Sequence, residues 1–141
     1  MLGRTAETTC FPVFQAKFPD LVRIKNPYAL FDFESPECRI ELKARTTPHD
    51  KYPTTIVGEN KVQAAEKDPR AHYFAFAFTD GLYWVQYDKD LFADFEVKDG
   101  GRRDRGRPEI KPYRYIPITA LTKVCDFTPD VPQPTRTMRI E

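Results

Sequence analysis

Two acidic residues and a lysine are spaced so that a β-hairpin would bring them together on one face. Asp32 and Glu41 lie on either side of a short loop, residues 35–38, and Lys43 follows Glu41 by two residues. With a four-residue loop, the register places Asp32 opposite Glu41, with their Cβ atoms about 5 Å apart. Strand periodicity then puts Lys43 on the same face as Glu41.

This combination of side chains favours one kind of chemistry. Two carboxylates at such a separation share a proton or hold a cation. Their oxygens are the ligands that Mg²⁺ and Mn²⁺ prefer. A bound divalent ion acidifies a water molecule and polarises a phosphoryl oxygen, while a nearby ammonium such as that of Lys43 orients the water or neutralises developing charge. The pattern therefore indicates phosphodiester hydrolysis with Mg²⁺ or Mn²⁺ and no organic cofactor.

Two neighbouring strands are needed to position these residues. In residues 39–45, charged and apolar side chains alternate strictly, which is the period of a half-buried strand. Residues 28–34 are the expected partner strand. The register that pairs Asp32 with Glu41 also places Glu34 opposite Arg39, and this favourable pair supports it.

The segments around this hairpin predict alternating helices and strands. We expect a short helix that starts near Pro12, because proline suits the first helical position. Residues 46–55 are expected to form a loop, and residues 56–68 a second helix that stops before Pro69. The fold class is therefore α+β, of α/β/α-like type, with a mixed central sheet flanked by helices.

Two further hairpins are expected in the C-terminal half. Residues 73–79 and 82–87 are joined by Asp80-Gly81, a pattern typical of a two-residue turn that would place Ala77 opposite Trp84. Both faces of this hairpin are apolar, so it should lie in the middle of the sheet. An extra C-terminal hairpin would pair residues 95–97 with residues 113–116 around the loop 99–108, with Pro117 ending the second strand.

Composition and length limit the classes of protein to consider. The chain has 141 residues and a net charge of +1, which suits one domain, residues 1–127, followed by an extended proline-containing tail, residues 128–141. A near-neutral chain excludes a general polycation that coats nucleic acid. Because no apolar run reaches the ~20 residues of a membrane span, no membrane is expected as a partner. The N-terminal residues lack a secretory signal and the three cysteines are scattered, so we expect a cytoplasmic protein with reduced thiols.

Asp32 and the run Glu41-Leu42-Lys43 resemble the motif of the PD-(D/E)xK superfamily of restriction-endonuclease-like nucleases. The order helix, two strands, helix and further strands is similar to the core of that family, and residues 41–61 are similar to its small virus- or phage-type members. Two features depart from the family pattern: Phe31 stands where proline is usual, and a hairpin follows the second helix. The resemblance covers residues 28–87.

The resemblance implies specific roles for several residues and a virus-encoded protein that acts inside a host cell. The implied catalytic residues are Asp32, Glu41, Lys43 and Lys61. The implied metal-site residues are Asp32, Glu41, Leu42 and Glu7, with Mg²⁺ or Mn²⁺ as the cofactor. The implied substrate is DNA, with a branched DNA or junction among the candidates, and a homodimer would supply the surface that one small domain lacks.

A basic segment offers a second candidate functional feature. Residues 100–114 contain six cations and two carboxylates, a local charge of +4. Clustered arginines among glycines suit fork-like contacts with phosphates. The expected nucleic-acid-binding residues are Arg45, Arg102, Arg103, Arg105, Arg107 and Lys111.

Less specific interpretations stay open at this point. The charged face of residues 39–45 could be a solvated sheet face with compensating salt bridges, and the arginine-rich loop could serve solubility alone. A non-catalytic nucleic-acid-binding protein, or a virion or assembly protein of the same fold, is the main alternative. His49 and His72 have no nearby nucleophile in the sequence, so a hydrolase triad has no support.

Overall fold

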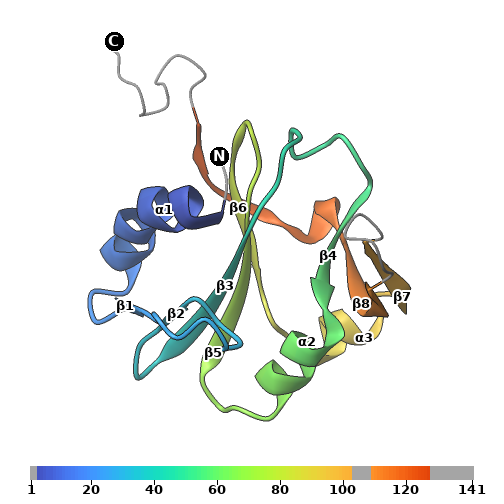
Figure 1. Ribbon diagram of the computed structural model, residues 1–141, viewed down its shortest axis with the longest axis horizontal. Coiled ribbons are helices and arrows are strands. Elements are labelled where there is room, and N and C mark those ends of the chain that lie inside the picture. Colours follow the sequence, from blue (N-terminus) through green and yellow to red (C-terminus); the bar gives the residue numbers. More distant parts are fainter. Residues whose placement is uncertain (1–2, 103–108, 128–141) are drawn as a thin grey trace.

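The computed structural model describes residues 3–102 and 109–127, with side chains described for residues 5–100 and 111–127. The helices are α1 (Gly3–Lys17), α2 (Glu59–Glu66), α3 (Lys89–Ala93) and the 3-10 helix η1 (Ile118–Ala120). A six-stranded sheet has the order β1-β2-β3-β5-β6-β9, and a three-stranded sheet has the order β4-β8-β7 (Figure 1). The expected α+β class with a mixed central sheet is confirmed.

The strands are short except in the centre of each sheet. Those of the six-stranded sheet are β1 (Val22–Arg23), β2 (Phe33–Glu34), β3 (Cys38–Ala44), β5 (Ala71–Ala77), β6 (Gly81–Gln86) and β9 (Thr122–Asp126). Those of the three-stranded sheet are β4 (Thr54–Gly58), β7 (Val97–Arg102) and β8 (Glu109–Pro117).

The connection between β3 and β5 determines the centre of the fold. These two strands are parallel neighbours, and the chain between them contains β4 and α2. On its other side, β3 pairs antiparallel with β2, with Glu34 opposite Arg39 as the sequence predicts. The expected partner strand, residues 28–34, is limited to β2. Asp32 lies just before it, and the Asp32 backbone N–H donates to the Ile40 carbonyl oxygen at 3.0 Å, which keeps this residue beside β3.

Each face of the large sheet has its own core. On one face, α1 packs against alternate residues of β3 and β5, including Ile40, Leu42 and Ala75. On the other face lie α2, α3 and the three-stranded sheet, as Figure 1 shows, packed around aromatic residues of β5 such as Phe74 and Phe76. The prediction of a central, doubly covered β5–β6 hairpin is therefore confirmed.

The first helix begins earlier than the sequence suggests. It starts at Gly3 rather than near Pro12, and Pro12 lies inside it. A proline removes one backbone hydrogen bond from a helix interior. Here Ala6, Cys10 and Phe14, four residues apart along α1, are all fully buried against the sheet, and this packing offsets the loss.

The expected start of the second helix is also wrong. Residues 54–58 form β4, where the sequence analysis places the end of a loop and the beginning of a helix. Thr54, Thr55 and Ile56 are β-branched, and the strand pairs with β8 along its whole length. The helix begins only at Glu59, after an extended Gly58.

The β5–β6 hairpin has a longer connection than a two-residue turn. Ala77 pairs with Leu82, so Trp84 faces Ala75 instead of Ala77. The shift of two residues leaves each side chain on its predicted face. Asp80 lies in this connection, where its carboxylate accepts a hydrogen bond from the His49 backbone N–H at 2.9 Å, and Gly81 begins β6.

The extra C-terminal hairpin is confirmed, but its strands are longer and its sheet is different. Strand β7 extends into the predicted loop 99–108, β8 begins directly after that loop at Glu109, and β8 ends at Pro117 as expected. They join β4 in the second sheet because β8 pairs with β4 on its other edge. Strand β9 and helix α3 have no counterpart in the sequence analysis.

The predicted tail, residues 128–141, lies outside the described residues. In the part of the chain that the structure describes, no helix is long and apolar enough to cross a membrane.

Candidate active site

Glu41 is a buried carboxylate between two lysines. It lies in the middle of β3 with 2% of its surface exposed, on the face that packs against α2. Its Oε2 atom accepts a hydrogen bond from Lys61 Nζ at 2.7 Å and forms an ion pair with Lys43 Nζ at 3.1 Å. Its Oε1 atom is buried and has no hydrogen-bond partner among the described residues. One oxygen of Glu41 is thus doubly neutralised, and the other has no partner in the described part of the chain.

Asp32 adjoins this carboxylate. Its Oδ2 atom accepts a hydrogen bond from the backbone N–H of Leu42, the residue after Glu41, at 2.8 Å. Burial, with a further contribution from the negative charge of Glu41, raises the pKa of Asp32 to about 7. The hairpin thus brings together the two acidic residues that the sequence analysis selects.

Glu7 approaches the same region from α1. Its charge also contributes to the raised pKa of Asp32, and Glu7 and Asp32 line one cavity of about 770 Å³. Glu7 is also engaged with Arg23, at 3.2 Å between Oε1 and Nη2. Leu42 has only its main-chain carbonyl to offer a cation, since its side chain packs in the core under α1.

The donor set suits a hard divalent cation. Asp32 and Glu41 supply carboxylate oxygens, and the unpartnered Oε1 of Glu41 is a buried acceptor that a cation would satisfy. The negative charge of Glu41 disfavours ionisation of Asp32, and a divalent ion bound between the two carboxylates would relieve this repulsion. The residues present therefore fit Mg²⁺ or Mn²⁺.

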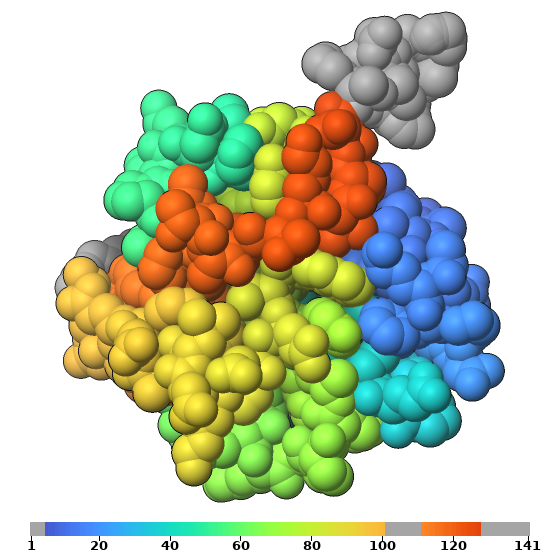
Figure 2. All heavy atoms as spheres, turned by 180° about the vertical axis from the view of Figure 1, so that it is seen from behind, coloured from blue at the N-terminus to red at the C-terminus, as the bar shows by residue number. Residues whose placement is uncertain are grey.

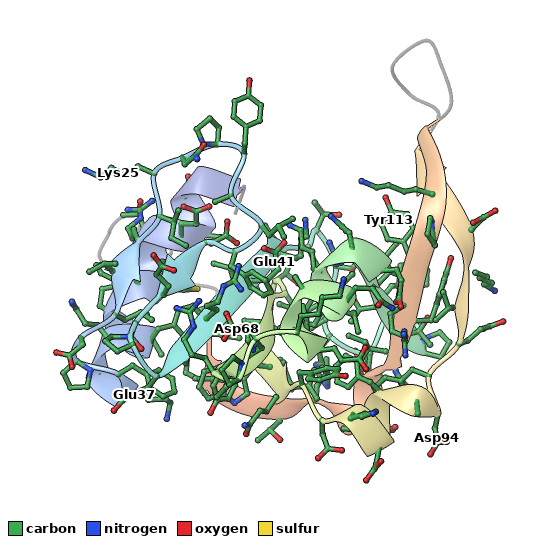
Figure 3. All side chains as sticks on the ribbon, turned by 90° about the horizontal axis from the view of Figure 1, so that it is seen from below. Lys25, Glu37, Glu41, Asp68, Asp94 and Tyr113 are labelled. Atoms are coloured by element: carbon green, nitrogen blue, oxygen red, sulfur yellow. The ribbon has the colours of Figure 1, made fainter. Side chains whose placement is uncertain are left out.

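A group of cations extends from this centre along β3 toward β8. Lys43, Arg45, Lys61 and Lys111 line a cavity of about 360 Å³, together with Tyr113. We call this surface the cationic groove. In Figure 3, Glu41 lies between the loop that carries Lys25 and strand β8, which carries Tyr113.

The predicted nucleic-acid-binding residues have different surroundings. Arg45 donates from Nε to Thr55 Oγ1 at 3.1 Å and from Nη2 to the Ile56 carbonyl at 2.7 Å, so it also ties β3 to β4. Lys111 is exposed at the mouth of the groove. Arg102 ends β7, and its side chain is outside the described part. Arg103, Arg105 and Arg107 also lie outside the described residues.

Sequence reasoning missed two polar arrangements. Arg114 forms a two-pronged ion pair with Glu59 and donates to the Phe92 carbonyl, so it joins β8 to α2 and α3. His49, Asp50 and Asp80 bring three possible metal-ligating atoms within 4.8 Å of one another. No sequence signal marks either set, because their members come from segments whose contact depends on the tertiary fold.

The mixed sheet has a parallel pair around the α2 crossover, with Asp32 just before β2 and Glu41 and Lys43 on the neighbouring β3. This arrangement defines a restriction-endonuclease-like domain of the PD-(D/E)xK class. A model of the family described as "Phage putative PDDEXK endonuclease" matches residues 15–124, and the chain belongs to this family. Comparison with curated proteins and with solved structures finds no match.

Proposed function

We propose that the chain is a divalent-metal-dependent endonuclease that hydrolyses DNA phosphodiester bonds. The observation that carries this proposal is the buried Glu41 carboxylate, directly beside Asp32. One of its oxygens is paired with two lysines, and the other has no partner among the residues that the structure describes. Burying an unsatisfied polar atom costs about 1–3 kcal/mol, and a cation bound at Oε1 would remove this cost.

In the proposed mechanism, Asp32 and Glu41 hold Mg²⁺ or Mn²⁺, with Glu7 as an outer acidic neighbour. The bound ion supplies Lewis acidity and an acidified water. Lys43 lies beside the carboxylate and projects into the cationic groove, where it can orient the attacking water and neutralise charge that develops on the phosphate. Lys61 fixes the orientation of Glu41 and adds a second positive charge to the groove.

Features outside the centre support DNA as the substrate. The cationic groove presents positive charge on a path leading away from Glu41, as phosphate binding requires. Cutting both strands of a duplex calls for two such centres, so we propose a homodimer for that substrate. The phage family supports action in the cytoplasm of a host cell, where the DNA of a phage is accessible.

The test is a cleavage assay on labelled linear, branched and single-stranded DNAs with Mg²⁺ or Mn²⁺. We expect metal-dependent cutting by the wild type and none by Glu41→Gln, which keeps the side-chain shape but removes the charge. Glu66→Gln, at the exposed end of α2, is the matched control and should cut normally. Binding of DNA that both variants retain, with no cutting by any form, would identify a non-catalytic binding protein instead.

A further inference from the structure

A second cavity lies next to the cationic groove and has a different lining. It measures about 530 Å³, and Arg45 and Ile56 line both spaces. The remaining wall comes from the segment between β3 and β4, the end of β5, and the β8–η1 region, which lie together at one end of the molecule (Figure 2). Its rings and apolar side chains are those of Pro48, His49, Tyr52, Phe78, Tyr115 and Ile118. We call it the aromatic cavity.

Contacts with residues outside the aromatic cavity hold several of its rings in place. His49 stacks on Tyr83 with ring centroids 4.5 Å apart, and its Nδ1 atom lies 2.6 Å from a carboxylate oxygen of Asp80. Phe78 packs edge-on against the same tyrosine. Tyr52 is different, because 58% of it is exposed. The cavity thus has a fixed aromatic wall and one accessible ring.

This lining suits a flat, largely apolar group with polar edges. Its size falls within the range of about 300–1,000 Å³ in which small organic ligands bind. Arg45 is its single cation, whereas four cations line the neighbouring groove. A phosphate would therefore prefer the groove, and a nucleobase, which stacks on aromatic faces whatever its sequence, would prefer the cavity.

We propose that the aromatic cavity binds an unpaired nucleobase of the DNA strand whose backbone lies in the cationic groove. The proposal rests on the proposed nuclease function and names its substrate class. Glu41 and Lys43 lie on one face of β3, and Arg45 follows directly after its end, so the catalytic centre and the cavity wall are about 13 Å apart along the chain. A base in an intact duplex is paired and stacked, so it cannot enter. The substrate is therefore single-stranded or branched DNA with an unpaired nucleotide near the cut.

The test measures DNA binding in EDTA, where no metal-dependent cutting takes place. Fluorescence polarisation follows a labelled single strand, the corresponding duplex, and single strands with one abasic site moved along the sequence. We expect the wild type to prefer the single strand, and one abasic position to weaken binding roughly tenfold. Tyr52→Ala should weaken binding of the intact single strand by a similar factor. In this variant the abasic site at that position should cause no further loss of affinity, as a double-mutant cycle requires for a direct contact.

Controls separate stacking from other effects. Tyr52→Phe keeps the ring and should bind like the wild type, whereas Tyr52→Leu should not. Leu91→Ala removes another exposed apolar side chain, on α3, and should change nothing. Lys111→Ala should weaken binding to every DNA, because it removes a phosphate contact of the groove.

The outcomes also separate this proposal from the nuclease proposal. Suppose that Tyr52→Ala binds the intact strand as tightly as the wild type does, that the wild type binds every abasic strand equally well, and that Lys111→Ala weakens binding. The base site is then rejected and the nuclease assignment stands. If binding depends on Tyr52 and on one base but no metal supports cleavage, the base site stands and the nuclease assignment is rejected.

Discussion

Lys61 Nζ lies 2.7 Å from Glu41 Oε2, although the two residues are 20 positions apart in the chain. One comes from α2 and the other from β3, and Lys43 reaches the same oxygen from the strand itself. Both ammonium groups therefore meet one oxygen of the carboxylate. Within residues 3–102 and 109–127, Glu41 Oε1 has no hydrogen-bond partner. The buried carboxylate therefore has one neutralised oxygen and one that could accept a cation.

Removing Lys61 should slow cleavage without unfolding the protein. Lys61→Ala releases Glu41 from α2 and removes one charge from the groove, so we expect the single-turnover rate to fall about 100-fold, the cost typical of losing one preorganised donor. Lys61→Arg should recover part of the rate. Lys67→Ala, an exposed lysine at the end of the same helix, is the control and should cut at the wild-type rate. Equal rates for both alanine variants would contradict the role of Lys61.

The raised pKa of Asp32 predicts an unusual pH dependence of stability. Its pKa is about 7 in the fold and about 3.9 in an unfolded chain, so the protonated carboxyl favours folding at low pH. That advantage is lost as the pH rises from about 4 to about 7. At pH 8 without metal, Asp32→Asn should therefore raise the free energy of unfolding by about 1–3 kcal/mol, and the gain should shrink near pH 4.

A bound metal ion should reverse the order of stability of the wild type and Asp32→Asn. At pH 8, Mn²⁺ should stabilise the wild type, which binds the ion in its folded state, and leave the stability of Asp32→Asn unchanged. Chemical denaturation with and without Mn²⁺ measures both effects. An Asp32→Asn protein that is less stable than the wild type in EDTA at pH 8 would show that the carboxylate is not under electrostatic strain.

His72 should make the protein more sensitive to acid. Its side chain is buried on β5, and burial lowers its pKa, so it is neutral in the fold. Its contribution to stability is present above about pH 6.5 and is lost as the pH falls below that value, because the unfolded chain then binds a proton that the fold excludes. Between pH 7 and pH 5, the wild type should lose up to about 1.4 kcal/mol per pH unit through this residue.

The substitution His72→Asn isolates this effect. In the wild type, His72 Nδ1 lies 2.7 Å from the Arg70 carbonyl, and an asparagine amide can still donate there. We expect urea denaturation of His72→Asn to show a flatter dependence on pH in this interval. A slope identical to that of the wild type would assign the acid sensitivity to other groups.

The ion pair between β8 and α2 should be worth more than surface pairs. Arg114 and Glu59 are both 13% exposed and meet through two nitrogen–oxygen contacts of 2.9 and 2.6 Å. Arg114→Ala leaves Glu59 half-buried without its partner, so the free energy of unfolding should fall by about 2–4 kcal/mol. Lys98→Ala, which breaks the exposed pair with Glu96, should cost less than about 1 kcal/mol. Thermal or urea denaturation of the two variants gives the comparison directly.

The local patterns of the sequence predict the hairpin at the site correctly. Strict alternation over residues 39–45 and the favourable Glu34–Arg39 pair are enough to establish β3 and the register of that pair, although the partner strand is limited to residues 33–34 of the expected 28–34. Both depend only on neighbouring residues and on the period of a strand. The resemblance at Asp32 and residues 41–43 then adds the family, which the match over residues 15–124 confirms.

Features that depend on distant packing are not visible in the same patterns. Pro12 indicates a helix start, yet the burial of Ala6 and Cys10 extends α1 beyond it. Residues 54–58 become a strand because β8 is available to pair with them. Whether Lys61 points at Glu41 depends on the rotation of α2 against β3, which no residue spacing within either element determines.

The parallel pairing of β3 with β5 has a consequence for the chain during its synthesis. Glu41 precedes the crossover, Lys61 lies within it, and β5 follows it, so the three come together only after the whole loop has closed. A nascent chain that ends before residue 77 has the acidic pair but no neighbouring strand to hold α2 above it. The centre is therefore assembled late, and truncated products of translation are expected to lack the activity proposed for the full chain.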